Sequence, residues 1–385
     1  MMIKLKIEKN IIYIYMVLLA YLKPYNITLI PAVDNIFKIV KIIITLIIIF
    51  QFIYNKMIIH KNNIYILCFA FVWALSVFIN KAPTAFFNNI LSIIGITLFF
   101  ESNYHSDSFK IVLSKALYNI SACFIILNFI TVILGYPFFA ADMNLGDNAN
   151  FLGGDNYSAF ILITFAGFMF FYDVYSNEKI SLKTKIITVL PLLGLLITFS
   201  LTGMIAYAIL LFAIYIKNSS IKYTVFNINI AILFCLIFLI GVSYLHFDTL
   251  LSVFLNRVEK VGFNGRNKIW PSAFSAIMQN PLIGYGAVSE ELRKTKILFF
   301  ANHTHNILLE YPFSTGLFGT TFFVLYLNGI FRNLKQMYYN KSMQVLMVTL
   351  FTYIFCSTFD FYIGMINLYL LLNMIYLYKH DENMR

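Results

Sequence analysis

Long apolar runs separated by short polar breaks make up most of this chain. A helix rises about 1.5 Å per residue, so about 20 apolar residues cross the core of a bilayer. The pattern therefore predicts an all-α, polytopic integral membrane protein that forms one membrane domain over residues 1–385. The predicted spans are 10–29, 36–54, 63–79, 85–101, 111–134, 157–174, 184–199, 203–217, 224–245, 305–330, 343–359 and 361–378, twelve in all.

Two places in this pattern are ambiguous. Lys23-Pro24 interrupts the first run, which makes it the weakest of the predicted spans. The run from 184 to 217 can be taken for one long helix, but Ser200-Leu201-Thr202-Gly203 supplies a turn that divides it.

One long polar segment stands out, covering residues 246–304 and preceding the tenth predicted helix. It carries seven basic and four acidic residues, a mild bias toward an anionic ligand. Charged groups beside a membrane are costly to place without a use. The segment and the start of the next span contain Gly265-Arg266-Asn267-Lys268-Ile269-Trp270, Asn280-Pro281-Leu282-Ile283-Gly284-Tyr285-Gly286 and Asn302-His303-Thr304-His305-Asn306, followed by Glu310, Gly316 and Gly319.

Basic residues predict the orientation in the membrane, because short cytoplasmic loops are enriched in Lys and Arg. If the N-terminus is inside, most basic residues of the short loops lie on the inner side. Both termini are then cytoplasmic, and the segments 134–156 and 246–304 share the outer side. Lys38 and Lys41 are exceptions to this rule, because they lie close to the outer end of a predicted span.

Composition agrees with a membrane protein. Of the 385 residues, 60% are hydrophobic and 12% are charged, against about a quarter charged in soluble domains. The net charge of +11 is explained by cytoplasmic loops, so no nucleic-acid partner is expected. The cysteines at 68, 123, 235 and 356 all fall in apolar runs, which predicts core residues rather than a disulfide framework or a metal site.

Arg266 and His305 are the strongest candidates for chemistry. A guanidinium presents a planar fork that matches phosphate oxygens, although a lone Arg can also snorkel to lipid headgroups. A neutral imidazole can take a proton from a sugar hydroxyl, although an interfacial histidine is the alternative. His303 and His305 are two residues apart and would not share a helix face, which argues against a metal site there.

Three further polar residues near these candidates have open roles. In a helix that begins near Asn302 or Thr304, Asn306 and Glu310 would form a polar stripe with Asn302. Glu310 could orient a histidine or pair with Arg266 or another cation. Asp360, in the predicted turn between the last two helices, is expected to be a solvated turn residue.

Absent motifs narrow the function. The chain has no GxxxxGK[ST] loop, so ATP hydrolysis is not expected to supply energy. It has no Asp-x-Asp pair, HExxH or GxSxG either, so we expect neither a metal-chelated nucleotide sugar nor any cofactor or metal.

The motifs in this order and spacing resemble the superfamily of O-antigen polymerases and O-antigen ligases. The resemblance rests on Gly265-Arg266-x3-Trp270, Asn280-Pro281-Leu282-x-Gly284-x-Gly286 and His305-Asn306-x9-Gly316-x2-Gly319, with Asp155-Asn156-Tyr157-Ser158-Ala159 after the earlier outer segment. The chain departs from the family pattern at two places. Family members often carry an arginine just after the turn at Ser200–Gly203, where this chain has Met204. Many also carry an arginine in the earlier outer loop, where this chain has none.

This resemblance implies a GT-C-like fold in the bacterial cytoplasmic membrane and a metal-independent glycosyltransferase. The donor and acceptor would be glycans on undecaprenyl diphosphate, with membrane lipid and a chain-length regulator as further partners. Arg266 would neutralise the leaving diphosphate and His305 would assist the acceptor hydroxyl, with Glu310 as a third catalytic residue. Substrate-binding residues would be Lys268, Arg257, Asn306, Trp270, His303 and Asn156, with Arg257 or Lys268 supplying the missing cation.

Three function classes fit the sequence. A polymerase of surface polysaccharide, O-antigen or capsule, is our first interpretation. A ligase that moves the finished glycan from the same lipid to another acceptor shares the motifs. A transporter or flippase without chemistry would explain the helices, but not a basic polar segment concentrated on one side.

Overall fold

The computed structural model describes residues 2–81, 87–135, 150–215, 266–286, 290–299, 301, 303–336, 340–361 and 364–378. Within these residues the only regular elements are helices, of which there are fourteen. They are α1 Met2–Tyr21, α2 Tyr25–Thr28, α3 Pro31–Tyr54, α4 Lys61–Ile79, α5 Phe87–Ser102, α6 Asp107–Leu134, α7 Asp155–Asn177, α8 Leu182–Ile197, α9 Leu201–Tyr215, α13 Arg266–Gln279, α14 Glu290–Lys296, α15 Ile307–Gln336, α16 Lys341–Ser357 and α17 Ile366–Leu377.

The protein is a polytopic membrane protein, as the apolar runs predict. Among the described residues, five helices are long and apolar enough to cross a bilayer: Pro31–Tyr54, Lys61–Ile79, Asp107–Leu134, Asn156–Asn177 and Ile307–Lys335. Each predicted span contains a helix except 224–245, which lies outside the described residues. The first span is wrong in extent. Helix α1 ends at Tyr21 because Lys23-Pro24 breaks it, and the separate short α2 follows.

The turn predicted between 184–199 and 203–217 is present. Helix α8 ends at Ile197 and α9 begins at Leu201, so the two are separate helices. The side chain of Ser181 caps the start of α8 by accepting from the backbone N–H of Thr184 at 3.2 Å.

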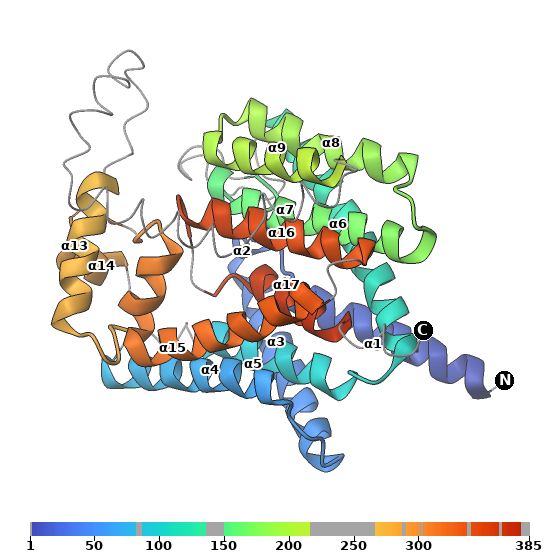
Figure 1. Cartoon of the computed structure of the whole chain (residues 1–385), viewed down its shortest axis with the longest axis horizontal. Helices are drawn as coiled ribbons and strands as arrows, with labels where there is room; N and C mark the ends of the chain where they lie inside the picture. Colours follow the sequence, from blue (N-terminus) through green and yellow to red (C-terminus); the bar gives the residue numbers. More distant parts are fainter. Residues whose placement is uncertain are drawn as a thin grey trace.

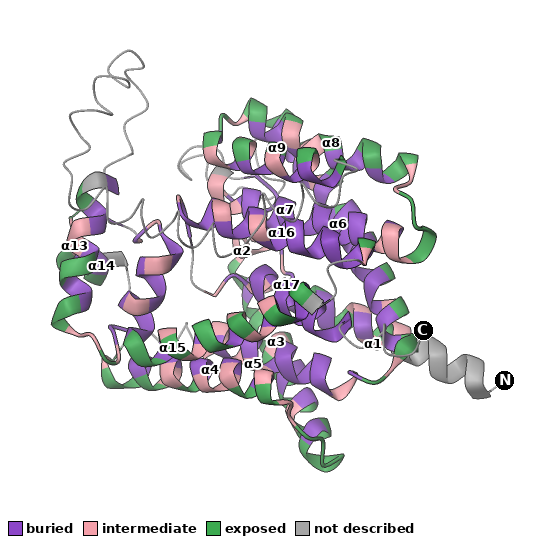
Figure 2. Ribbon diagram, in the orientation of Figure 1, coloured by how far each residue is buried: buried purple, intermediate pink, exposed green. Residues whose placement is uncertain are grey.

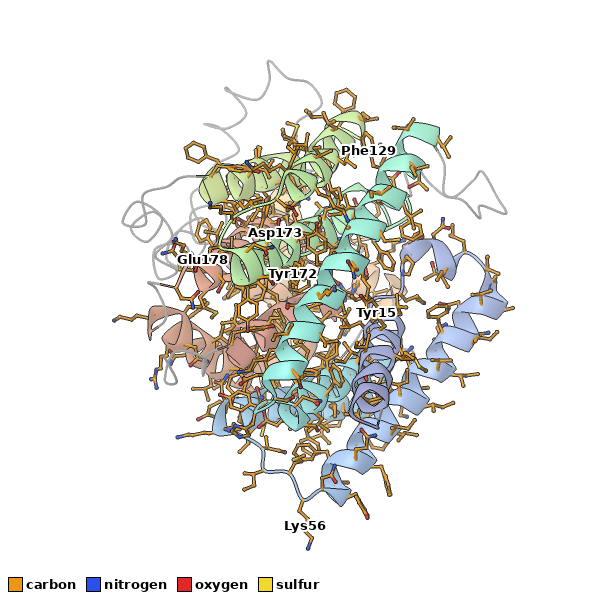
Figure 3. All side chains as sticks on the ribbon, turned by 90° about the vertical axis from the view of Figure 1, so that its right-hand side faces the viewer. Tyr15, Lys56, Phe129, Tyr172, Asp173 and Glu178 are labelled. Atoms are coloured by element: carbon orange, nitrogen blue, oxygen red, sulfur yellow. The ribbon has the colours of Figure 1, made fainter. Side chains whose placement is uncertain are left out.

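Helices far apart in sequence pack side by side. Helix α4 lies along α15 in the opposite direction, because Ser76 contacts Ser314 near one end and Asn62 meets Gly329 near the other. Helix α7 lies between α6 and α16, and buried side chains concentrate there and on α17 (Figure 2). Tyr15 of α1 lies beside α6, where Asn119 Nδ2 donates to its hydroxyl at 2.7 Å (Figure 3).

Helix α15 is broken at Gly316, where φ is 62° and ψ is −172°. A break in a membrane helix leaves backbone carbonyl and N–H groups without their helical partners. The loop at residues 280–286 supplies them. Tyr285 and Gly286 donate N–H groups to the carbonyls of Phe313 and Ser314 at 2.8 and 2.9 Å, and Leu317 and Phe318 donate to the carbonyls of Pro281 and Leu282 at 2.7 and 3.2 Å.

The glycines of this loop and of the break are required by close backbone approach. A Cβ on Gly316 would lie 2.2 Å from the Leu282 carbonyl oxygen, and one on Gly284 would lie 2.5 Å from the Gly316 nitrogen. Both residues also have positive φ, which favours glycine. The Asn-Pro-Leu-x-Gly-x-Gly and His-Asn-x9-Gly motifs therefore form one structural unit.

Part of the polar segment folds into helices over this unit. Helices α13 and α14 stand beside the first half of α15, at the opposite side of the molecule from the start of α1 and the end of α17 (Figure 1). A small hydrophobic cluster joins them, built from Ile269, Trp270, Ala273, Ala276, Ile277, Tyr285, Ile297, Ala301, Leu309 and Phe313. The segment is thus held by a core of its own against the broken helix.

Candidate active site

Two histidines converge on one carboxylate next to the start of α15. His303 Nε2 lies 2.8 Å from Asp360 Oδ1, and His305 Nδ1 lies 3.0 Å from the same oxygen. The two imidazole rings pack together, with centroids 3.7 Å apart. The Asp360 side chain is 1% exposed, whereas those of His303 and His305 are 13% and 20% exposed. A buried carboxylate therefore holds two imidazoles that remain partly accessible.

The expectation that Asp360 is a solvated turn residue is wrong, because it is buried. The argument from helical spacing also fails for the histidines. Helix α15 begins at Ile307, and His305 has a positive φ of 54°, so the chain bends between His303 and Asn306 and brings the two rings together. The predicted stripe through Asn306 and Glu310 does not form, for the same reason; Asn302 lies outside the described residues.

The protonation of this cluster follows from its chemistry. Burial alone would raise the pKa of Asp360, but hydrogen bonds from His303 and His305 and their nearby charge hold it well below its ordinary value. An ionised carboxylate only accepts hydrogen bonds, so the nitrogens facing Asp360 carry the protons. For a neutral His305, this leaves Nε2 with a lone pair.

The surroundings of His305 favour its neutral form. Burial is the largest effect and lowers the pKa of His305 below its ordinary value of 6.5, and the charges of His303 and Arg266 lower it further. The hydrogen bond and charge of Asp360 act in the opposite direction but are outweighed. A neutral imidazole oriented through Nδ1 is the form that a general base requires.

Glu310 pairs with Arg293, a residue that the sequence indicated only as part of a basic segment. Arg293 lies in α14, and its Nη2 and Nη1 donate to Oε1 and Oε2 of Glu310 at 2.7 and 3.2 Å. Both side chains are buried. The prediction that Glu310 pairs with a cation is confirmed, and the cation is Arg293 rather than Arg266.

Glu310 also fixes the residue between the two histidines. The backbone N–H and the hydroxyl of Thr304 both donate to Glu310 Oε2, at 3.2 and 2.9 Å. The hydroxyl of Ser314 donates to Oε1 at 3.3 Å. The carboxylate therefore ties α14, the bend at 303–306 and the first half of α15 together.

Arg266 opens α13 and is buried, and it lies close enough to His305 for its charge to lower the pKa of that histidine. Lys268, two residues on, is exposed. Trp270, in the first turns of α13, is fully buried in the small hydrophobic cluster described above and so packs α13 against it. The structure thus gathers His303, His305 and Glu310 around the bend at 303–306 and places Arg266 within electrostatic range of His305.

The other predicted binding residues lie elsewhere or have structural partners. Asn306 is buried, its Nδ2 donating to the Thr358 carbonyl at 3.1 Å and its Oδ1 accepting from Leu308 N–H at 2.8 Å. Asn156 lies at the start of α7 and accepts from the Ser200 hydroxyl at 3.0 Å. None of the contacts among the described residues joins Asn156 to His305. Arg257 lies outside the described residues.

The same cluster offers a ligand set that fits a metal ion. One ligand atom from each of His303, His305 and Asp360 lies within 4.8 Å of the others. Two imidazoles and a carboxylate are ligands that several divalent metals accept. Sequence spacing did not reveal this set because its third member is 55 residues away from His305 in the chain.

Sequence reasoning missed the roles of Asp360, Arg293 and Thr304. A signal existed for Asp360, since a carboxylate inside a strongly apolar stretch is costly unless it has partners. Arg293 gave no signal of its own, because Lys294 and Lys296 surround it with equivalent charge. Only the fold shows that Arg293 points at Glu310.

Comparison with known families agrees with the motifs. Residues 186–324 match the family model described as O-antigen ligase. The match runs from α8 into the second half of α15 and includes Arg266, the 280–286 loop, both histidines and Gly316. The resemblance that the motifs indicate is therefore confirmed. A search of curated proteins found no match to this chain.

Proposed function

We propose that this chain, whose residues 186–324 match the family model described as O-antigen ligase, is a polymerase of surface polysaccharide, either O-antigen or capsule. Its substrates are repeat units linked to undecaprenyl diphosphate on the outer face of the cytoplasmic membrane. The observation that carries the proposal is the accessible His305 imidazole, held by buried Asp360 and within electrostatic range of buried Arg266. A base within electrostatic range of a cation suits the attack of a hydroxyl on a sugar diphosphate.

The reaction balances with these two groups. A hydroxyl of the acceptor sugar attacks the anomeric carbon of the donor glycan, and His305 Nε2 takes the hydroxyl proton as the new C–O bond forms. The bond between the anomeric carbon and the diphosphate oxygen breaks, and its electron pair leaves with undecaprenyl diphosphate. Arg266 stabilises the negative charge that grows on this leaving group. No nucleotide is consumed, because the donor is already activated.

The remaining polar residues of the site position these two. Asp360 selects the His305 tautomer, and His303 packs against its ring. Glu310, in place of a direct catalytic role, holds the bend at 303–306 through Thr304 and is itself held by Arg293. Asn306 supports the same bend through its bond to the Thr358 carbonyl, and Trp270 holds α13 through the small hydrophobic cluster.

Phosphate binding falls to the basic residues around Arg266. Lys268 is exposed two residues after Arg266 and offers a second cation to the diphosphate. We keep Arg257 as a phosphate ligand and Asn156 as a sugar ligand, on the strength of the sequence alone. A chain-length regulator remains a proposed partner.

We further propose the topology that the basic residues favour. Twelve spans in a GT-C-like plan would place both termini in the cytoplasm, and the polar segment 246–304 outside. A cysteine at Lys268 should then react with an impermeant thiol reagent in intact cells, and one at Glu178 should not. Both positions are exposed, so the comparison is matched. Labelling at Glu178 alone would reverse the orientation.

The proposed site works without a metal or a cofactor. Asp360 accepts a hydrogen bond from each histidine, and this leaves Nε2 of a neutral His305 available to take a proton. A metal held by His303, His305 and Asp360 would occupy the imidazole lone pairs and supply Lewis-acid chemistry instead. The two readings make opposite predictions for a chelator.

One genetic experiment separates the function classes. In a strain lacking this chain, a polymerase defect leaves a single repeat unit attached to its final acceptor, without long chains. A ligase defect leaves polymer on the carrier lipid with nothing attached to the acceptor. A transporter defect leaves substrate on the inner leaflet, which an outer-face labelling assay detects.

A further inference from the structure

A second group of basic residues lies away from the histidines, at the start of α3. Lys23, between α1 and α2, pairs with the carboxylate of Asp34, and Lys38 donates to the same carboxylate at 2.6 Å. Lys41 lies one turn further along and within electrostatic range of all three groups. In the part of the chain that the structure describes, Asp34 is the only carboxylate paired with these lysines. Three cations therefore share one anion.

The lysines of α3 lie on its protein-facing side. Residues spaced alternately by four and three share one face of a helix, and here that face is formed by positions 34, 38, 41, 45, 48 and 52. Thr45, Ile48 and Phe52 are buried on this face, but the Lys38 side chain is 47% exposed. On the first half of this face Asp34 is buried, Lys41 is half-buried and Lys38 is exposed, so the face is accessible at Lys38.

Depth makes this charge costly without a counter-ion. Lys41 follows the start of α3 at Pro31 by ten residues, which is about 15 Å of helix, within a helix long and apolar enough to cross a bilayer. Ionisable residues so placed generally face a polar path or a ligand, and not lipid tails. The opposite face of α3 is apolar and exposed, as expected for a lipid-facing surface, and carries Ile39, Ile43, Leu46 and Phe50.

This group lies at the same end of the helix bundle as the His–Asp cluster. The backbone N–H of Asn26 in α2 donates to the Phe151 carbonyl at 3.1 Å, just before α7 begins. Phe160 in the first turns of α7 packs on Tyr353 in α16, the helix that ends shortly before Asp360. The Asn26 side chain is fully buried, and its amide has no hydrogen-bond partner among the described residues, so it offers a further donor here.

We propose that Lys23, Lys38 and Lys41 form a second phosphate-binding subsite, which holds the diphosphate of a polyprenyl-linked glycan. This inference rests on the proposed function, since it assigns a place to one of its two lipid-linked substrates. A diphosphate carries enough negative charge to satisfy the lysines that Asp34 leaves over. Bulk phospholipid is the weaker candidate, because it would meet the lipid-facing side of α3 and not the side that carries the lysines.

Binding of geranylgeranyl diphosphate to the purified full-length protein in phosphatidylcholine nanodiscs tests this subsite. Lys38→Gln/Lys41→Gln removes two charge-assisted contacts and should weaken binding at least about tenfold. Lys38→Arg/Lys41→Arg keeps the charges and should retain most of the affinity. Asp34→Asn removes the competing carboxylate and should tighten binding. Lys185→Gln/Lys335→Gln changes two exposed lysines elsewhere and should leave the affinity unchanged.

Several results would overturn the subsite. One is unchanged affinity in Lys38→Gln/Lys41→Gln; another is unchanged or weaker binding in Asp34→Asn. Competition by phosphatidylglycerol nanodiscs as strong as that by the diphosphate would assign the lysines to bulk lipid. If the double variant fails to fold, Lys23→Gln and Asp34→Asn give the same comparison. No sugar transfer is measured, so the subsite can stand if the polymerase assignment fails, and the reverse also holds.

Discussion

The guanidinium of Arg293 and the carboxylate of Glu310 form a two-fold hydrogen-bonded pair, buried on both sides, beside the bend that carries the histidines. A buried pair of this kind adds little stability by itself, but the loss of one partner leaves an uncompensated charge. The pair therefore acts as a fastening between α14 and the first half of α15. Removal of the pair should displace Thr304 and thereby change the position of His305.

Removing one partner of this pair should destabilise the site. Glu310→Gln leaves Arg293 buried without its counter-charge, and we expect a loss of about 3–5 kcal/mol. The double variant Arg293→Met/Glu310→Leu should lose less than Glu310→Gln alone, because it leaves no charge behind. Thermal unfolding of the purified protein, followed by size-exclusion chromatography, checks the order. A double variant less stable than Glu310→Gln would contradict the fastening role.

Arg266 and His305 should show catalytic defects that a structural anchor would not. Arg266→Lys keeps the charge and loses the planar fork, so turnover should fall severely. Arg266→Ala should be worse, with a loss of about 100- to 1000-fold, the range for one oxyanion donor. His305→Ala should lose about 100- to 10,000-fold, as for a missing general base. The readout is polymer length on a gel, normalised to the abundance of each variant in the membrane.

His303→Ala is the matched control for His305→Ala, because both imidazoles contact the same oxygen of Asp360. We expect a mild defect from it. Equal defects in the two histidine variants, together with near-normal chains from Arg266→Lys, would show that these residues only anchor the segment to lipid headgroups.

Asp360 should control the pH dependence of the reaction. Since the pKa of His305 lies below 6.5, activity should be constant near pH 7 and fall only as the pH drops through that lower value and His305 gains a proton. Asp360 raises the pKa of His305, so Asp360→Asn should move this acidic limb to still lower pH. It should also slow turnover, because the tautomer is no longer fixed. The pH profile of kcat/KM for purified protein measures both effects, and an unmoved limb would exclude a base oriented by Asp360.

Chelation decides between the base and the metal readings of the same three residues. If His305 acts as a base, activity in a purified system should survive EDTA. Complete loss of activity, restored by Zn²⁺ or Mn²⁺, would instead assign His303, His305 and Asp360 to a metal centre. Metal analysis of the untreated protein by mass spectrometry is the direct control.

The break in α15 should tolerate no side chain at Gly316. Gly316→Ala places a Cβ 2.2 Å from the Leu282 carbonyl oxygen at a residue with positive φ, so we expect a cost of at least about 1–3 kcal/mol. Gly194→Ala, inside α8 and with its nearest neighbour at 3.8 Å, should be neutral or slightly stabilising. Thermal unfolding of the two variants checks the contrast, which equal melting temperatures would refute.

Sequence reasoning recovered the parts of this molecule that depend on local pattern. Apolar runs located the helices, and the motif order indicated the resemblance to O-antigen ligases over residues 186–324, because both signals lie within short stretches of chain. It failed where partners are distant. Asp360 gained its role from a bend created by His305, and Arg293 gained its role from the placement of α14 beside Glu310 in the first half of α15. Spacing rules assume regular helix, and residues 303–306 are not helical.

The backbone hydrogen bonds between the 280–286 loop and α15 constrain the number of residues in that loop. Four bonds bridge the break, and they involve main-chain atoms, so no particular side chain at Leu282 or Ile283 is required to make them. What the bonds do require is that Pro281 and Gly286 stay the same number of residues apart. A single inserted residue would put one pair of bonds out of step with the other, whereas many substitutions would leave both intact. The length of the loop is therefore fixed, and this part of the protein is most sensitive to insertions and deletions.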